Sequence, residues 1–239
     1  TYGFSTYRIR LSLRGAGGKY VADDDKWTRA EAALRAAMDS AGIQYDPAEG
    51  EAAFYGPKAD FMAKDALGRE WQLSTIQVDF IQPSRLNCEY IPEDGQPRTP
   101  VVIHRAVTGS TERFLGVIIE HFAGAFPVWL SPVQAKLIPI ADRHIPYMQE
   151  VAAKLTEAGL RVEIDSSGNR MQNKIRAAQV QKIPYMLVAG DRDIEAGAVS
   201  VRLRTEEQLG SLSIDDFLAL VLPVINTKSL DLKTPRGIA

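Results

Sequence analysis

The chain has 239 residues, of which 45% are apolar and 24% charged. This composition is typical of a soluble globular protein with room for two domains, and it excludes a disordered or fibrous one. The formal net charge of −2 requires no polyanionic partner, so any contact with nucleic acid must come from a local basic patch. The single cysteine excludes an intramolecular disulfide and indicates a reducing, cytoplasmic location. The apolar stretches 114–119 and 217–225 are too short to cross a bilayer, so we expect no membrane partner.

The first part of the chain predicts an antiparallel sheet with one helix packed on it. Apolar and polar residues alternate over residues 7–13, which is the period of a half-buried strand. Apolar positions then recur at helical spacing over residues 26–41, and Gly42 stands where a helix commonly ends. Further segments of strand-like composition are joined by turn residues and predict long antiparallel strands; they are residues 51–65, 69–82, 86–91 and 100–107.

The pattern changes in the second half of the chain. Residues 112–123 are apolar on nearly all sides and predict a buried helix. From residue 133, strands and helices alternate, which predicts a compact, mostly parallel α/β domain. The expected strands are 133–140, 160–165, 185–189 and 198–204, and the expected helices are 145–158, 170–182 and 213–221. We therefore expect an α/β (α+β) fold class, with domains at 1–130 and 131–225 and a tail at 226–239.

Polar side chains gather on two neighbouring predicted strands, where packing does not explain them. The aromatic and aliphatic positions of residues 54–80 are accounted for by a core, but the polar positions are not. A half-buried sheet face this polar is more typical of a ligand site than of a solvated surface, which remains the alternative. The polar residues are Tyr55, Lys58, Gln72, Thr75, Gln77 and Asp79.

Three segments carry a resemblance to a known family. Residues 54–58 are FYGPK, residues 67–80 are LGREWQLSTIQVDF, and residues 100–114 are PVVIHRAVTGSTERF. In this order they resemble the threonine–tRNA ligase family of class II aminoacyl-tRNA synthetases, and the last resembles motif 3. The resemblance implies part of an antiparallel-sheet catalytic domain followed by an anticodon-binding domain. It also implies ATP-dependent ligation of L-threonine to tRNA(Thr) through a threonyl-adenylate, with ATP used as its magnesium complex.

The resemblance assigns roles to the polar residues. Tyr55, Lys58 and Gln77 are expected to contact threonine, whereas Gln72 and Thr75 are expected to contact ATP. Strict alternation along a strand puts Thr75 and Gln77 on one face and Gln72 on the other. We therefore predict a β-bulge near residues 73–74. A regular ladder there would exclude Gln72 from the site.

Arg113 is expected in the first turn of the helix that follows Ser110. Ser110 is a good N-cap residue, and Glu112 places an acid in the first turn. An arginine among apolar helix neighbours needs an anionic partner, which is either an internal carboxylate or, as the resemblance implies, the phosphate of ATP. In the second case Arg113 is catalytic, because its charge stabilises the α-phosphate while the threonine carboxylate attacks it.

His104 lies in a predicted apolar strand, where a lone histidine is usually a packed core residue. The resemblance instead implies that His104 is one of three protein ligands of a zinc ion. Such an ion binds the amino and hydroxyl groups of threonine, which provides a basis for rejecting valine. The other two ligands of the family, a cysteine and a histidine, match no position of this chain. Cys88 is expected to be a small buried residue and His121 a packed or capping one.

The predicted second domain carries basic residues in the helical segment 170–182 and in the strand 198–204. A solvated helix face is the simple explanation of the first group. Residues 181–191, QKIPYMLVAGD, and residues 201–204, VRLR, resemble the anticodon-binding domain of the same family. Arg202 is then the leading candidate for contact with an unstacked anticodon base, with Asp193 beside it. The basic residues are Arg170, Lys174, Arg176, Lys182, Arg202 and Arg204.

The resemblance does not supply a whole active site. Motif 1, which builds a homodimer interface, and motif 2, whose arginine holds the α-phosphate, do not occur in the sequence. We therefore expect this polypeptide to belong to a longer enzyme and to be inactive alone. The alternative function is a non-catalytic, synthetase-derived tRNA-binding or regulatory module carried by residues 133–225. A nucleotide binder built on residues 15–19 is disfavoured, because this loop lacks the spacing of a phosphate-binding fingerprint.

Overall fold

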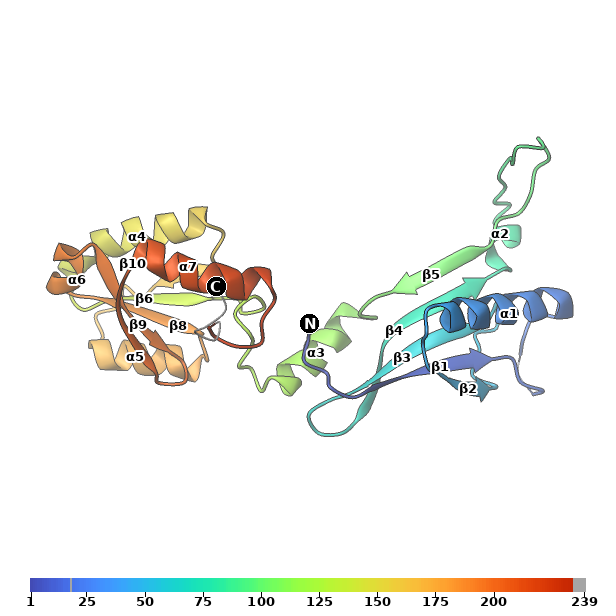
Figure 1. Ribbon diagram of the computed structural model, residues 1–239, viewed down its shortest axis with the longest axis horizontal. Coiled ribbons are helices and arrows are strands. Elements are labelled where there is room, and N and C mark those ends of the chain that lie inside the picture. Colours follow the sequence, from blue (N-terminus) through green and yellow to red (C-terminus); the bar gives the residue numbers. More distant parts are fainter. Residues whose placement is uncertain (18, 234–239) are drawn as a thin grey trace. The chain divides into compact units, whose positions relative to one another are not determined.

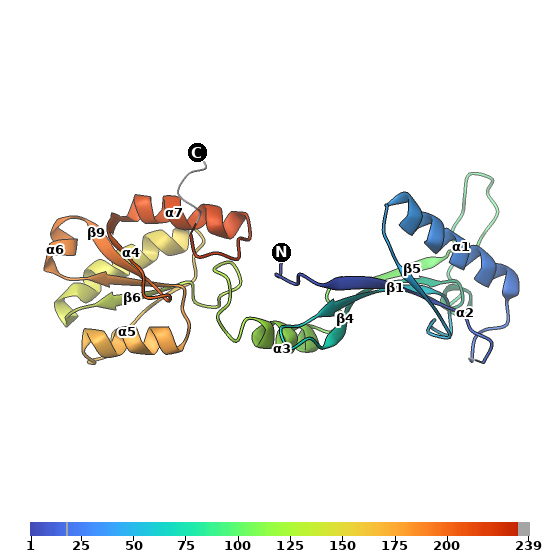
Figure 2. The same ribbon diagram turned by 60° about the horizontal axis from the view of Figure 1, so that its bottom comes forward.

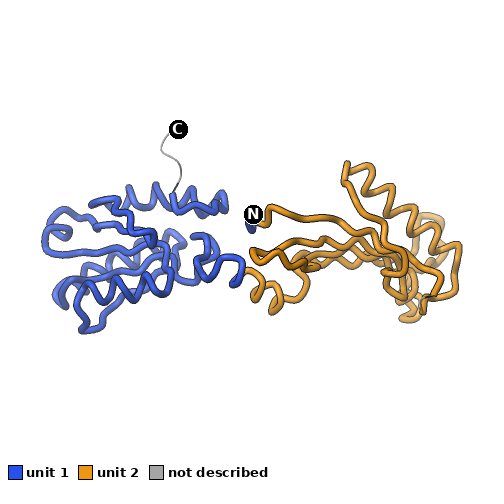
Figure 3. Tube along the Cα trace, turned by 90° about the horizontal axis from the view of Figure 1, so that it is seen from below, with its two compact units in different colours: residues 1–3, 119–239 blue, residues 4–118 orange. Residues whose placement is uncertain are grey.

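The computed structural model of the protein describes residues 1–17 and 19–233 (Figure 1). The chain forms two compact units, of which unit 1 comprises residues 1–3 and 119–239 and unit 2 comprises residues 4–118 (Figure 3). Within the described ranges, none of the helices combines the length and the apolar character that a membrane span requires.

Unit 2 is built on a five-stranded sheet in the order β2-β1-β3-β4-β5. β1 pairs with β3, β3 with β4 and β4 with β5 in antiparallel fashion, as predicted, whereas β1 and β2 run parallel, which was not predicted. The predicted strand at 51–65 is confined to its second half, and β2 was not predicted. The strands are β1 (Tyr7–Leu13), β2 (Asp46–Glu49), β3 (Lys58–Lys64), β4 (Glu70–Asp79) and β5 (Val102–Ala106).

Helix α1 (Asp24–Ser40) covers one face of this sheet, as Figure 2 shows. Its buried residues Leu34 and Met38 pack against Leu11 of β1 and Ala59 of β3. Full burial of one such large side chain contributes about 1.5–3 kcal/mol. Because side chains alternate along a strand, the residues that flank Leu11 and Ala59 point to the face that α1 does not cover.

The strand predicted at residues 86–91 is wrong. The chain instead enters the short helix α2 (Gln82–Arg85), because the carboxylate of Asp79 accepts hydrogen bonds at 2.9 Å from the two backbone N–H groups at its start. Beyond α2 the only pairing in the described chain before β5 is a bridge between Tyr90 and Arg98. The hydrogen bonds to Asp79 therefore favour a helical turn directly after β4, and residues 86–91 join no sheet.

Helix α3 (Thr111–His121) is present, but it is not buried on all sides as predicted. Val117 and Ile118 are buried, whereas the side chains of Leu115 and Ile119 are 50% and 46% exposed. The apolar composition correctly predicted a helix. It did not predict how much of the helix surface other segments cover.

Unit 1 is built on a second five-stranded sheet, in the order β10-β9-β8-β6-β7. β6 runs parallel to both β7 and β8, as the alternating strands and helices predicted. β9 and β10 complete the sheet as antiparallel strands, so the sheet is mixed rather than mostly parallel. The strands are β6 (Ala135–Pro139), β7 (Val162–Ile164), β8 (Tyr185–Ala189), β9 (Ala198–Leu203) and β10 (Gln208–Ser213), of which β10 was not predicted.

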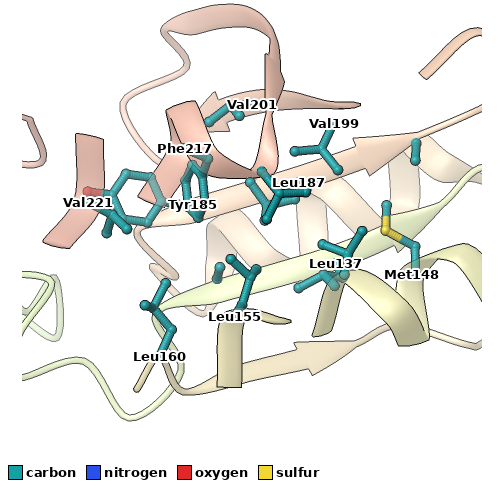
Figure 4. Packing of buried hydrophobic residues seen from close by; sticks show 14 of the residues in the cluster. Leu137, Met148, Leu155, Leu160, Tyr185, Leu187, Val199, Val201, Phe217 and Val221 are labelled. Carbon is teal, nitrogen blue, oxygen red and sulfur yellow. The ribbon is translucent and has the colours of Figure 1, made fainter. Parts of the chain in front are cut away.

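Helices cover both faces of the unit 1 sheet, with α4 and α7 on one face and α5 on the other (Figure 2). The larger core lies under α4 and α7, where Leu137, Tyr185 and Phe217 are fully buried (Figure 4). The core under α5 contains residues of β6 and β8, such as Ile138 and Met186. The helical elements are η1 (Asp142–His144), α4 (Ile145–Glu157), α5 (Met171–Val180), α6 (Asp191–Glu195) and α7 (Ile214–Asn226).

Candidate functional site

The uncovered face of the unit 2 sheet gathers polar residues that the sequence singled out. Lys58 on β3 pairs with Gln77 on β4, and Gln77 pairs in turn with His104 on β5. Residues that pair directly in an antiparallel sheet point to the same face and lie close together. These three side chains therefore form one polar row across three strands.

Tyr55 joins this row from the turn that precedes β3. Its hydroxyl donates a hydrogen bond to Oε1 of Gln77, and its ring lies 5.9 Å from the ring of His104, centroid to centroid. Burial and the negative charge of Asp79 raise the pKa of Tyr55 above its ordinary value. The phenol is therefore neutral at physiological pH and can donate a hydrogen bond.

Gly56 brings this turn against β4. A Cβ atom at position 56 would lie 1.7 Å from the carbonyl oxygen of Val78, so a larger residue would force one of the two segments to move. The backbone N–H of Val78 also donates to the carbonyl oxygen of Pro57 at 3.0 Å. The glycine of the FYGPK segment thus permits the close approach of Tyr55 to Gln77.

The predicted bulge in β4 is confirmed. Two successive residues of β3 pair with Ser74 and Gln72, so Leu73 is an extra residue on β4. The bulge returns Gln72 to the face that also carries Thr75. Both side chains donate to Oδ1 of Asp60, from Nε2 of Gln72 at 2.7 Å and from Oγ1 of Thr75 at 3.0 Å.

Asp60 itself was not predicted as a site residue. Its side chain is fully buried in β3, and its Oδ2 accepts a hydrogen bond from Nζ of Lys58 at 2.7 Å. Burial alone would raise the pKa of Asp60, but hydrogen bonds from Lys58, Thr75 and Arg10 outweigh burial and leave this pKa lowered. Strand alternation places Asp60 on the same face as Lys58, and this signal could have identified it.

His104 is not the packed core residue that a lone histidine on an apolar strand usually is. Its side chain is 44% exposed, and its Nε2 lies 2.9 Å from Oδ2 of the buried Asp79. Burial alone would raise the pKa of Asp79, but the hydrogen bonds from His104 and from two backbone N–H groups lower it. A histidine held by a carboxylate through one ring nitrogen can bind a metal ion through the other, and metal-binding histidines commonly do so.

This donor suits zinc, but it is a single ligand. Across residues 1–17 and 19–233, no three histidine, cysteine, aspartate or glutamate side chains lie close enough together to hold a metal ion. Cys88 was expected to be buried and is instead exposed. His121 packs its ring 5.0 Å from that of Phe122, which agrees with the packed role expected for it.

Arg113 lies beside the bulge, at the start of α3. Its Nη2 donates to the carbonyl oxygen of Gln72 at 3.0 Å, and its backbone N–H donates to Oγ of Ser110 at 3.2 Å, as expected for an N-cap. The side chain is exposed rather than surrounded by apolar neighbours, so the expectation that burial forces a partner on it is wrong. Gly109, with a φ of 67°, leaves the space for this contact, because a Cβ there would lie 3.1 Å from Nη2 of Arg113.

The two predicted anticodon contacts lie in unit 1, Arg202 on β9 and Asp193 on α6. Both carboxylate oxygens of Asp193 are engaged inside the unit, by the backbone N–H of Gly190 at 3.0 Å and by Oγ of Ser200 at 2.8 Å. Ser200 and Arg202 point to the same face of β9. Nε of Arg202 is buried and has no hydrogen-bond partner among the residues that the structure describes. Within the described chain, Arg202 therefore has an unused hydrogen-bond donor, whereas each carboxylate oxygen of Asp193 already accepts a hydrogen bond.

The basic segment 170–182 is not one solvated face. Lys174 is 4% exposed, and its Nζ lies 3.0 Å from the carbonyl oxygen of Asp165 and 3.4 Å from that of Pro139. The ammonium group thus joins the carboxyl ends of β6 and β7. Arg170 and Arg176 are exposed and retain the surface position expected of the segment.

Lys182 and Arg204 anchor the segment that precedes the unit 1 sheet. Nζ of Lys182 donates to the carbonyl oxygen of Ala123, and Nη1 of Arg204 donates to that of Phe126 at 2.5 Å. Burial lowers the pKa of Arg204. Both side chains thus have a structural role in unit 1, in contacts with backbone carbonyl groups.

Two family models match the chain. Residues 1–122 match the tRNA synthetase class II core domain (G, H, P, S and T), and residues 132–222 match the anticodon-binding domain. These matched segments contain the polar row of unit 2 and Arg202 of unit 1, respectively.

Curated relatives and a solved structure identify the amino-acid specificity of the synthetases that this chain resembles. The threonine–tRNA ligase of Rubrobacter xylanophilus is 69% identical over 206 residues, which are 86% of this chain and 32% of that protein. That of Thermus thermophilus is 52% identical over 219 residues, 91% of this chain and 33% of that protein, so this chain spans about a third of their length. The RNA-binding domain of threonyl-tRNA synthetase from Cryptosporidium parvum matches with a TM-score of 0.82 and 36% identity, over 99% of this chain and 57% of that one. The chain therefore belongs to the threonine–tRNA ligase family of class II tRNA synthetases.

Proposed function

We propose that this chain contributes to the ATP-dependent ligation of L-threonine to tRNA(Thr) through a threonyl-adenylate. The observation that carries the proposal is the polar row of Lys58, Gln77 and His104, which Tyr55 joins from a neighbouring turn. The row lies on the sheet face that α1 leaves open. Its donors and acceptors match a small polar amino acid better than they match an apolar ligand.

On the threonine side, Tyr55, Lys58 and Gln77 would bind and orient the amino acid. The hydroxyl of Tyr55 and the amide of Gln77 already hold each other, so their positions are fixed before a ligand arrives. Side chains fixed in this way lose less entropy on binding than mobile ones do. Nζ of Lys58 is held at one position by Asp60 and keeps further N–H donors for a carboxylate.

On the ATP side, Gln72, Thr75 and Arg113 would bind the nucleotide. In the first step, a carboxylate oxygen of threonine forms a bond to the α-phosphorus of ATP, and the bond from this phosphorus to the leaving pyrophosphate breaks. The guanidinium of Arg113 donates to the carbonyl oxygen of Gln72 and has further N–H groups to offer the α-phosphate. Its positive charge would stabilise the transition state, and Mg²⁺ would enter bound to ATP.

We further propose that His104 is a zinc ligand, with its ring oriented by Asp79. A zinc ion bound there would supply a Lewis-acid contact to the amino and hydroxyl groups of threonine and so disfavour valine. The remaining ligands would come from outside this chain, because its described residues gather no set of three potential ligands around His104.

For tRNA, we propose that Arg202 contacts an anticodon base from the α5 face of β9, with Ser200 and Asp193 beside it. The unsatisfied Nε of Arg202 supports this assignment. The alternative, a non-catalytic tRNA-binding module, would use the same residues of unit 1. As part of a longer ligase, the chain would act in the cytoplasm within a homodimer.

The test is threonine-dependent ATP–pyrophosphate exchange by a chimera, in which this chain replaces the matching segment of the Rubrobacter xylanophilus ligase. We expect exchange by the chimera and none by the 239-residue chain alone. Lys58→Ala should raise the KM for threonine, whereas the matched variant Lys64→Ala, at the other end of β3, should leave it unchanged. A chimera that folds and binds tRNA(Thr) but gives no exchange would contradict the ligase proposal and favour the binding module.

A further inference from the structure

Asp60 lies where the proposed threonine and ATP sides of the site meet. Its Oδ2 accepts a hydrogen bond from Nζ of Lys58 at 2.7 Å, on the threonine side. Its Oδ1 accepts from Nε2 of Gln72 at 2.7 Å and from Oγ1 of Thr75 at 3.0 Å, on the ATP side. One carboxylate thus fixes side chains that belong to two substrates.

Asp60 cannot contact either substrate itself. Its side chain is fully buried, and Oδ2 accepts two more hydrogen bonds, from Oγ of Ser12 at 3.0 Å and from Nη2 of Arg10 at 3.2 Å. Ser12 is also fully buried, and it lies on β1 opposite Lys58, next to Arg10 on the same face. Any effect of Asp60 on the reaction must therefore pass through the residues that it holds.

The negative charge of Asp60 is required by its neighbours. The cations Lys58 and Arg10 lie against the same oxygen, and without a negative charge between them they would repel each other in a partly buried place. A neutral amide at position 60 would keep one acceptor oxygen and turn an NH₂ group toward the other set of donors. Either Lys58 or the pair Gln72 and Thr75 would then lose its partner.

We propose that Asp60 is a positioning residue, which holds Lys58, Gln72 and Thr75 in one arrangement and so sets the threonine and ATP sites together. The proposal rests on the proposed function, because that function assigns the ligands of the three residues. It adds a residue to the site that touches no substrate and yet influences the binding of both.

The test compares Asp60→Asn with Asp65→Asn in the chimera. Asp65 is a matched control, since it is also buried, lies at the end of the same β3–β4 hairpin, and accepts hydrogen bonds from Arg69 and Trp71. We expect Asp60→Asn to raise the KM for both threonine and ATP and to lower kcat/KM about 100-fold, the effect of a small misplacement of binding groups. Asp65→Asn should lower stability and leave both KM values unchanged.

Ser12→Ala keeps the charge of Asp60 and removes one of its donors, so it should raise both KM values by a smaller factor. If Asp60→Asn does not fold, Ser12→Ala decides: a rise in both KM values supports the proposal, and unchanged values overturn it. Equal effects of Asp60→Asn and Asp65→Asn on the two KM values would also overturn it, because a merely structural role predicts equality.

A measurement on the 239-residue chain separates this proposal from the ligase function. The side-chain NH₂ signal of Gln72, assigned by its loss in Gln72→Ala, should shift in the NMR spectrum of Asp60→Asn and stay in place in Asp65→Asn. Absence of exchange by the unsubstituted chimera would overturn the proposed function, and the Gln72 signal would still decide whether Asp60 positions this side chain. An unmoved signal in Asp60→Asn would overturn the inference.

Discussion

Gln72 and Thr75 stand three residues apart on β4 and still point to the same face of the sheet, where both donate to Oδ1 of Asp60. A regular strand would separate them to opposite faces. The extra residue Leu73 resolves this conflict, and its side chain is buried with Val117 of α3. The bulge thus serves two purposes, because it aims Gln72 at the site and supplies an apolar contact to α3.

Substitution of Gly56 by alanine should disturb the turn that carries Tyr55. The new Cβ would lie 1.7 Å from the carbonyl oxygen of Val78, so the turn must move away from β4. We expect a loss of about 1–3 kcal/mol in the free energy of unfolding, measured by urea denaturation, because overpacking costs this much. Gly116→Ala is the control: no atom within 4 Å meets its Cβ, and alanine favours a helix by about 0.8–1 kcal/mol. Equal stability of Gly56→Ala and the unsubstituted chain would contradict the prediction.

Much of the local structure of unit 2 could be predicted from the sequence, including strands, the polar face of the sheet and the β-bulge. The alternation of apolar and polar residues predicted β1 and the polar face of the sheet. The bulge near Leu73 was predicted because strict alternation puts Gln72 and Thr75 on opposite faces, whereas the family resemblance assigns both to the ATP side. What could not be predicted is which side chains meet across the sheet. Asp60 receives hydrogen bonds from Ser12, 48 residues earlier, and from Thr75, 15 residues later. Such partners depend on strand order and register, which no local pattern contains.

Burial was also harder to predict than secondary structure. A helix was correctly expected within residues 112–123, where α3 spans Thr111–His121, but Leu115 and Ile119 are about half exposed. Apolar composition indicates which side chains can be buried. It does not indicate which other segments of the chain pack against them. Lys174 is the opposite case, since its charge suggested a solvated helix face and its ammonium group is buried against two carbonyl oxygens.

Arg202 on β9 and Arg204, which directly follows β9, should behave differently although the two arginines lie two residues apart. Arg202→Ala should weaken the binding of tRNA(Thr) to the 239-residue chain by about 1–3 kcal/mol, because it would remove the base contact proposed for Arg202. Arg204→Ala should instead lower the free energy of unfolding by about 1–3 kcal/mol, since it removes a charged donor from the carbonyl oxygen of Phe126, which then accepts only from Oγ of Ser131 among the described residues. Fluorescence titration at fixed salt measures the first effect and thermal unfolding the second. An exchange of the two phenotypes would refute the assignment of Arg202 to the anticodon.

His104→Ala should abolish zinc binding by the chimera, as measured by the metal content of the purified protein. Asp79→Asn should weaken zinc binding about 10- to 100-fold, because it removes the carboxylate that orients the ring of His104. Cys88→Ala and His121→Ala are the controls and should retain zinc. Retention of zinc by His104→Ala would show that other residues hold the ion.

Asp65 should make the stability of the chain depend on pH below about pH 4. Burial alone would raise its pKa, but hydrogen bonds from Trp71, Arg69 and two backbone N–H groups lower the pKa from 3.8 to about 2. A carboxyl group whose pKa is lower in the folded state stabilises that state above its unfolded pKa, and this contribution is lost as the pH falls through the folded pKa.

The free energy of unfolding of the 239-residue chain should therefore fall between about pH 4 and pH 2 more steeply than that of Asp65→Asn, which has no carboxyl group to protonate at this position. The comparison isolates Asp65 because the other carboxyl groups titrate in both proteins. Urea denaturation at several pH values provides the measurement. Parallel curves for the two proteins over this range would show that the hydrogen bonds to Asp65 do not favour its charged form.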